Sequence, residues 1–109
     1  MTLPRVPPGL QILERSTPDG IVLELIGSLD ADTAGDFGTR LDALLERATG
    51  AVELHMAGVR FVSSLGIGCL ICAFGDFQRA GRELLITNLT PELHQMLQML
   101  HLLDYIKAR

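Results

Sequence analysis

The sequence predicts an α/β fold, a four- to five-stranded mixed sheet with helices packed against it. Short apolar stretches rich in β-branched residues alternate with longer stretches whose apolar residues recur at helical spacing. Their order is β-β-α-β-α-β-α, so that helices connect successive strands. The 109 residues, of which 48% are hydrophobic, suffice for one domain over residues 1–109, with an irregular leader at residues 1–9.

The first two strands are expected to form a hairpin. Residues 10–15 are compatible with a strand, and residues 21–26 are apolar and β-branched. Between them, residues 16–20 contain proline, aspartate and glycine, which favour a turn because proline sets φ and glycine tolerates positive φ.

A helix follows the second strand. Ala34, Phe37, Leu41, Leu44 and Ala48 recur at helical spacing and predict its buried face. Carboxylates near its start suit the positive end of the helix dipole. The Thr-Gly pair at residues 49–50 is a stop signal.

The third strand is expected over residues 51–56, with residues 57–62 as a bridge to the next helix. Ser63 or Ser64 would be the N-cap of that helix, which spans residues 65–80. Its sequence is apolar all round at first and amphipathic later, so we expect it to be buried at its start and to emerge towards its end.

The last elements have clear boundaries. Residues 84–87 form an apolar strand, and Thr90 followed by Pro91 marks the N-cap and first position of a final helix. Residues 102–106 form a short apolar tail, which we expect to pack back onto the domain.

Charge and composition exclude several classes of function. The net charge is −4 and Lys107 is the only lysine, whereas a nucleic-acid binder needs a cationic stripe. No apolar run approaches the roughly 20 residues of a membrane-spanning helix, and residues 1–10 lack a signal-peptide pattern. We therefore expect a cytoplasmic protein with no membrane insertion and a protein or small-molecule partner.

Ser63 and Ser64 are the first candidate site. A phosphate at the start of a helix would meet free backbone N–H groups and the positive dipole end, so it could be accommodated without unfolding. It would also place about −1.5 to −2 charges at one surface spot, which makes a switch. The alternative is that a serine here only caps the helix.

Cys69 and Cys72 have the CxxC spacing but lie inside the expected helix among apolar residues. Redox-active pairs place the first cysteine at a helix N-terminus, so we expect two buried, unreactive thiols. No second CxxC exists and the three histidines are scattered, so no metal or other cofactor is expected. No phosphate-binding loop or serine-hydrolase elbow occurs either.

Three segments together resemble the STAS domain, the domain of anti-sigma factor antagonists and of sulfate-transporter tails. They are residues 27–30 (GSLD), 52–68 (VELHMAGVRFVSSLGIG) and 81–86 (GRELLI), within a similarity that covers residues 10–106. The resemblance implies a STAS-like fold and a non-enzymatic regulator. Stand-alone antagonists of this kind bind an anti-sigma factor, usually a serine kinase, and thereby release a sigma factor. The kinase phosphorylates a residue at the start of the helix after the third strand, the complex dissociates, and a phosphatase resets it.

The motif departs from the family pattern at the acceptor position. The family commonly has Asp-Ser-Ser/Thr-Gly, and alignment on Gly66 puts Leu65, which has no hydroxyl, at the usual acceptor. Phosphorylation then shifts to Ser64, our first choice, or to Ser63, or it does not occur and binding is constitutive. By the same resemblance, the expected partner-binding residues are Asp30, Ser63, Ser64, Leu65, Gly66 and Ile67.

Two alternatives remain open. One is a STAS scaffold, or an accessory subunit of an ABC lipid-transport complex, that binds its partner without phosphorylation. The other is a thiol oxidoreductase that uses Cys69 and Cys72. Gene neighbourhood separates the first from a sigma regulator, and thiol reactivity tests the second.

Overall fold

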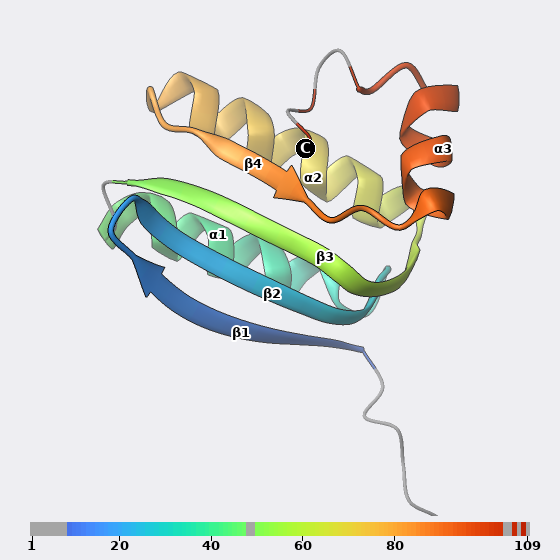
Figure 1. Ribbon diagram of the computed structural model, residues 1–109, viewed down its shortest axis with the longest axis horizontal. Coiled ribbons are helices and arrows are strands. Elements are labelled where there is room, and N and C mark those ends of the chain that lie inside the picture. The colour runs from blue at the N-terminus through green and yellow to red at the C-terminus, as the bar shows by residue number, and fades with distance from the viewer. Residues whose placement is uncertain (1–8, 48–49, 104–105, 107, 109) are drawn as a thin grey trace, which may run out of the picture.

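The computed structural model describes residues 9–47, 50–103, 106 and 108 (Figure 1). Its elements follow the expected order β-β-α-β-α-β-α, and the predicted fold class is confirmed. They are β1 (Leu10–Thr17), β2 (Gly20–Leu29), α1 (Ala34–Arg47), β3 (Ala51–Val62), α2 (Ser64–Arg79), β4 (Leu84–Thr87) and α3 (Pro91–Met99).

The four strands form one mixed sheet in the order β1-β2-β3-β4. β1 and β2 form the predicted antiparallel hairpin, while β2, β3 and β4 are parallel to one another. Beyond β4, Ala108 makes an isolated parallel bridge with Ile86 at that edge of the sheet. Most of the expected leader, residues 1–8, lies outside the described residues.

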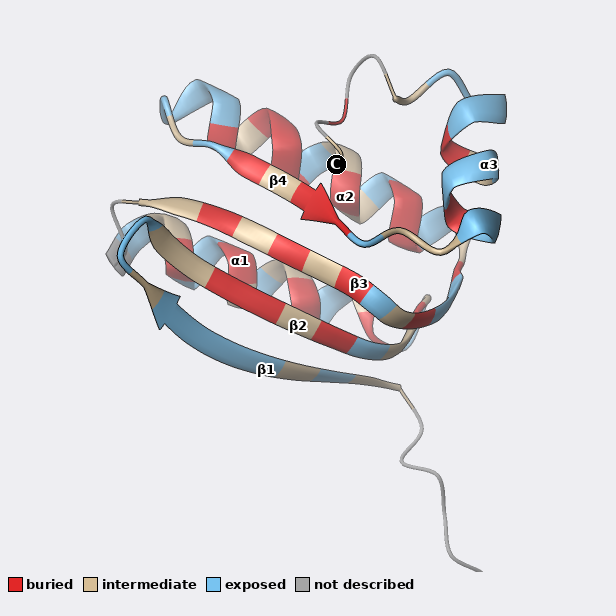
Figure 2. Cartoon of the chain, viewed as in Figure 1, coloured by how far each residue is buried: buried red, intermediate tan, exposed pale blue. Residues whose placement is uncertain are grey.

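Helices α1 and α2 lie side by side on one face of the sheet, behind it in Figure 1. Alternate residues of the central strands point toward these helices and are fully buried, as the banding of Figure 2 shows. From α1, the expected residues Phe37, Leu41 and Leu44 complete this core. Ala48 and Thr49 lie outside the described residues. The core residues contributed by the strands are Leu23, Leu25, Leu29, Val52, Leu54, Met56, Val59, Val62, Leu84 and Ile86.

The third strand is twice as long as expected, because the predicted bridge at residues 57–62 is part of it. The register with β2 shifts twice, between Glu24 and Ile26 and between Gly27 and Ser28. At each shift β3 contains one extra residue, so these are β-bulges. A bulge breaks the two-residue alternation of apolar and polar residues by which a strand is predicted. The predicted strand therefore ended at Met56, at the first bulge.

The expectation that α2 is buried at its start and emerges later is wrong. Its buried residues form a stripe along its whole length, from Gly66 to Phe77, because one side of the helix lies flat on the sheet. The opposite side is exposed from the first turn onward, where Leu65 is 62% exposed. Apolar residues on that outer side misled the sequence prediction.

The last part of the chain packs as expected where it is described. The Thr90 hydroxyl accepts a hydrogen bond from the Leu93 amide (3.3 Å), and Pro91 is the first residue of α3. Leu93 and Leu97 attach this helix to the core, and Ile106 is 1% exposed within it. Residues 104–105 of the predicted tail lie outside the described residues.

Candidate functional site

The candidate residues gather where β2 and β3 end. Asp30 follows β2 and Ser63 follows β3, and because these strands are parallel and adjacent, the two loops lie at the same edge of the sheet. The Ser63 amide donates a hydrogen bond to the carbonyl oxygen of Leu29 (2.9 Å). This bond joins the serine loop to the strand that carries Asp30.

Asp30 organises its own loop. Its Oδ1 accepts a hydrogen bond from the Asp32 amide (2.9 Å), and its own amide donates to Oγ1 of Thr33 (2.9 Å). The buried Thr33 hydroxyl in turn donates to the carbonyl oxygen of Ser28 (2.8 Å). The Asp30 carbonyl accepts from the amides of Thr33 and Ala34, so this turn leads directly into α1.

Ser63 is the N-cap of α2. It has extended backbone angles, φ −80° and ψ 174°, and its side-chain oxygen accepts a hydrogen bond from the Gly66 amide (3.2 Å). Its carbonyl accepts from the Ile67 amide (2.8 Å), the first bond of the helix ladder. The Ser63 hydroxyl therefore stabilises the helix start, because it accepts a hydrogen bond from the Gly66 N–H, which has no partner within the helix.

Ser64 and Leu65 occupy the exposed side of the first turn of α2. Ser64 is exposed, and Leu65 is a large apolar side chain of which 62% lies in solvent. Of the two candidate serines, Ser64 is thus the more accessible to a modifying enzyme, and its position at the positive end of the helix dipole suits a phosphate.

Gly66 and Ile67, also expected to contact a partner, face inward and are buried. A Cβ on Gly66 would overlap with the carbonyl oxygen of Leu29 and would lie 3.0 Å from the side chains of Leu29 and Val62. These two residues therefore support the loop from within, and the accessible part of the predicted set is Asp30, Ser63, Ser64 and Leu65.

Phe61, to which sequence reasoning assigned no role, lies near this loop at the end of β3. It lies two residues before Ser63 and is 53% exposed. The second bulge of β3 lies next to it, at the pairing of Ser28 with Phe61. A large aromatic residue two positions before the serine pair was the available signal, but the broken alternation hid the direction of its side chain.

The two cysteines lie in a groove between α1 and α2, and both are free thiols. The expectation that both are buried is wrong for Cys72, which is exposed, and Cys69 is half-buried with Sγ 3.5 Å from the carbonyl oxygen of Ala34. Burial, with smaller contributions from the charges of Cys72 and Asp42, raises the pKa of the Cys69 thiol. A raised pKa opposes the thiolate that redox catalysis requires.

The described residues contain no group of three or more His, Cys, Asp or Glu side chains arranged to hold a metal ion. None of the helices in the described part of the chain is long and apolar enough to cross a membrane. The candidate site offers one fully exposed serine, Ser64, two exposed apolar side chains and a carboxylate loop, which together suit recognition by another protein.

The family comparison matches the model described as "Mlab, STAS domain" to residues 12–106. No curated protein sequence matches the chain. Solved structures that resemble it share its fold at low sequence identity. An anti-sigma factor antagonist from Mycobacterium paratuberculosis is 16% identical, with a TM-score of 0.83, over 94% of this chain and 87% of that one.

Two further structures show the same fold. The Bacillus cell fate determinant SpoIIAA in its phosphorylated form is 17% identical, with a TM-score of 0.70, over 92% of this chain and 90% of that one. A variant of RsbS from Moorella thermoacetica is 16% identical, with a TM-score of 0.75, over 91% of this chain and 86% of that one.

Proposed function

Because the chain belongs to the STAS domain family, we propose that it is a non-enzymatic, cytoplasmic partner-switching regulator of the anti-sigma factor antagonist type. In this role it binds an anti-sigma factor of the serine-kinase class and so releases a sigma factor. The observation that carries the proposal is the exposed Ser64 hydroxyl in the first turn of α2, beside the Asp30 loop and the exposed side chains of Phe61 and Leu65.

Ser64 is the proposed phosphorylation site. Phosphorylation at Ser63 would first have to release the hydroxyl from the Gly66 amide, at a cost of about 1 kcal/mol for a lost N-cap. Ser64 carries no such bond among the described hydrogen bonds. A phosphate there would add charge next to Leu65 and would weaken an apolar interface by desolvation and repulsion.

The proposed contact surface is apolar at its centre and acidic at its rim. Phe61 and Leu65 would supply the buried anchors, since large side chains that are desolvated on binding dominate interface energies. Asp30 and the neighbouring Asp32 would supply rim charge, which affects association rate and partner choice more than affinity. Gly66 and Ile67 would act by holding the loop in place.

The test combines binding with modification. The chain is titrated with a purified serine-kinase anti-sigma factor from the same genome, first without ATP and then with ATP, and the products are analysed by mass spectrometry. We expect a 1:1 complex that dissociates as one phosphate appears on Ser64. Ser64→Ala should bind and resist dissociation, while Ser64→Asp should bind at least tenfold more weakly.

Two results would count against this function. Failure of every serine-kinase anti-sigma factor of the source genome to bind the unphosphorylated chain contradicts the regulator assignment. Binding without phosphate on Ser64 or Ser63 contradicts the phosphoswitch alone.

Leu65 favours a second candidate. It stands where antagonists of this family carry their acceptor, and a leucine there cannot be phosphorylated. A STAS scaffold, or an accessory subunit of an ABC lipid-transport complex, would bind its partner constitutively through the same surface. Binding to the ATPase of such a transporter, unaffected by Ser64→Asp, would favour this candidate over the first.

A further inference from the structure

The topology leaves one face of the sheet without a helix. The chain passes from β2 to β3 to β4 in one direction across the sheet, through α1 and then α2. Parallel crossovers of the same hand that advance in the same direction place their helices on the same face. Both helices therefore cover one side, and no helix of the described chain covers the other side of β1, β2 and β3 (Figure 1).

An uncovered face is unusual for parallel strands. Antiparallel sheets commonly expose one face to water, whereas parallel strands are normally covered on both. We call this side the open face. The register of the strands places on it Gln11, Leu13, Arg15, Val22, Glu24, Ile26, Glu53, His55, Leu85 and Thr87, and beyond the bulges it continues to Ser28 and Phe61.

Apolar side chains are exposed at one end of the open face. Leu13 is 46% and Ile26 is 37% exposed, although both belong to regular strands. Leu13 pairs with Glu24 across the hairpin, and Ile26 lies two residues further along β2 on the same face. This end offers apolar contact area next to a carboxylate.

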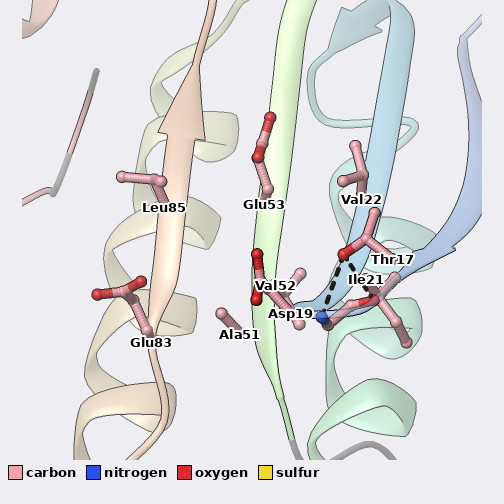
Figure 3. Close-up of a pocket in the computed structure, with 10 residues that line it drawn as sticks. Thr17, Asp19, Ile21, Val22, Ala51, Val52, Glu53, Glu83 and Leu85 are labelled. Atoms are coloured by element: carbon pink, nitrogen blue, oxygen red, sulfur yellow. Dashed lines mark hydrogen bonds between the residues drawn. The ribbon is translucent and has the colours of Figure 1, made fainter.

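The other end of the open face holds an acidic hollow of about 380 Å³ (Figure 3). It lies at the amino ends of β2, β3 and β4 and includes Asp19, Glu53 and Glu83 in its lining. Glu53 is held in place by the Thr87 hydroxyl, which donates to its Oε2 (2.8 Å). Small molecules in parallel sheets usually bind at the carboxyl ends of strands, so this hollow is better suited to a side chain of a docked protein.

The charges define the chemistry of the occupant. Among the described residues of the open face and its rim, Asp19, Glu24, Glu53 and Glu83 are acidic, and Arg15 is basic. Such a surface repels nucleic acid and anionic membranes. A second copy of the chain would bring like charges together.

We propose that the open face is a docking surface for a basic, amphipathic helix of a partner protein. Along β2, the stretch of the open face from Gly20 to Ile26 covers six residue steps, or about 20 Å. Across its four strands, the sheet is about 15 Å wide. A helix of about 13 residues matches this length, and its diameter of about 10–12 Å fits the width. Its apolar side rests on Leu13 and Ile26, and its basic residues meet Glu24 and enter the hollow.

The acidic hollow is separate from the proposed switch. The switch residues follow the carboxyl ends of β2 and β3, whereas the hollow lies at the amino ends of the strands. The inference does not depend on the proposed function.

The test uses a 14-residue helical peptide of leucine and lysine, and a counterpart in which glutamate replaces lysine. Each is titrated into the full chain labelled with ¹⁵N and followed by NMR and calorimetry. We expect saturable 1:1 binding of the lysine peptide, with shifts confined to the open face, and no binding of the glutamate peptide. Glu24→Lys and Ile26→Lys should each weaken binding at least tenfold.

Glu46→Lys is the matched control, since it makes the same charge change on the exposed side of α1 and should leave binding within twofold. Circular dichroism tests whether each variant is folded. If Glu24→Lys unfolds, Glu24→Gln takes its place and should weaken binding severalfold. Shifts spread over α1 and α2, or equal weakening by Glu46→Lys, would show nonspecific attraction and overturn the proposal. Self-association through the open face in sedimentation experiments would overturn it as well.

Discussion

Ser63 is hydrogen-bonded through its backbone amide to the carbonyl oxygen of Leu29, across the ends of two parallel strands. Gly66 passes the same carbonyl so closely that no side chain fits between them. The serine loop and the Asp30 loop are thus held together by backbone atoms, and their relative position does not depend on flexible side chains. Five predictions concern this loop and other contacts of the fold.

Gly66→Ala should destabilise the protein by about 1–3 kcal/mol, because the new Cβ overlaps with the Leu29 carbonyl and the neighbouring strands must move. Gly68→Ala is the control on the same helix, since a Cβ there meets nothing within 4 Å. It should stabilise the protein by about 0.5–1 kcal/mol through helix propensity. Urea unfolding measures both, and equal effects would contradict the close contact at Gly66.

Ser63→Ala should cost about 1 kcal/mol of stability, because the Gly66 amide loses its capping acceptor. Ser64→Ala, on the exposed side of the same turn, should change stability by less than about 0.5 kcal/mol. Thermal unfolding of the two variants separates the structural serine from the proposed regulatory one. The assignment of these roles is reversed if Ser64→Ala is the more damaging change.

Arg82 closes the end of α1, and its removal should cost about 3 kcal/mol. Its guanidinium donates hydrogen bonds to the carbonyl oxygens of Leu44 (3.2 Å), Leu45 (3.1 Å) and Gly50 (2.6 Å), and it lies 5.4 Å from the centroid of the Phe77 ring. Arg82→Met keeps much of the side-chain volume but leaves these carbonyls without their donor.

The matched control for Arg82 is Arg79→Met. Arg79 is 74% exposed and pairs with Asp76 on the surface of α2, so its loss should cost at most about 1 kcal/mol. Denaturant unfolding of both variants provides the comparison. Similar costs at the two positions would show that the Arg82 contacts contribute little to stability.

Cys72 should react with iodoacetamide well before Cys69 near neutral pH. Cys72 is exposed, whereas burial keeps the pKa of the Cys69 thiol raised, so that less of it is thiolate. Mass spectrometry of the Cys69→Ser and Cys72→Ser variants, labelled over a pH series, measures each rate. Faster labelling of Cys69 would revive a redox role for the pair.

The same shift has a consequence for stability. A thiol whose pKa is raised by folding retains its proton in the folded state when the unfolded chain has lost it. Its contribution is therefore fully present below the unfolded pKa and is lost as the pH rises through the folded pKa. Cys69→Ser should reduce the loss of stability on the alkaline side, as measured by unfolding at several pH values.

The sequence by itself determined the order of elements, the hairpin, the core face of α1 and the start of α3, because each rests on local signals. Proline and glycine mark turns, hydroxyl residues cap helices, and apolar residues recur with the period of the element that buries them. It also located the serine pair at a helix start and the leucine beside it.

Only the tertiary structure decided what lay beyond those signals. The two bulges of β3 depend on pairing with β2, and they turn Phe61 outward. Which side of α2 meets the sheet decides that Leu65 and Cys72 are exposed while Gly66 is buried. The open face exists because strand order places both crossover helices on one side. Each of these outcomes depends on contacts between segments far apart in the chain, which local patterns do not encode.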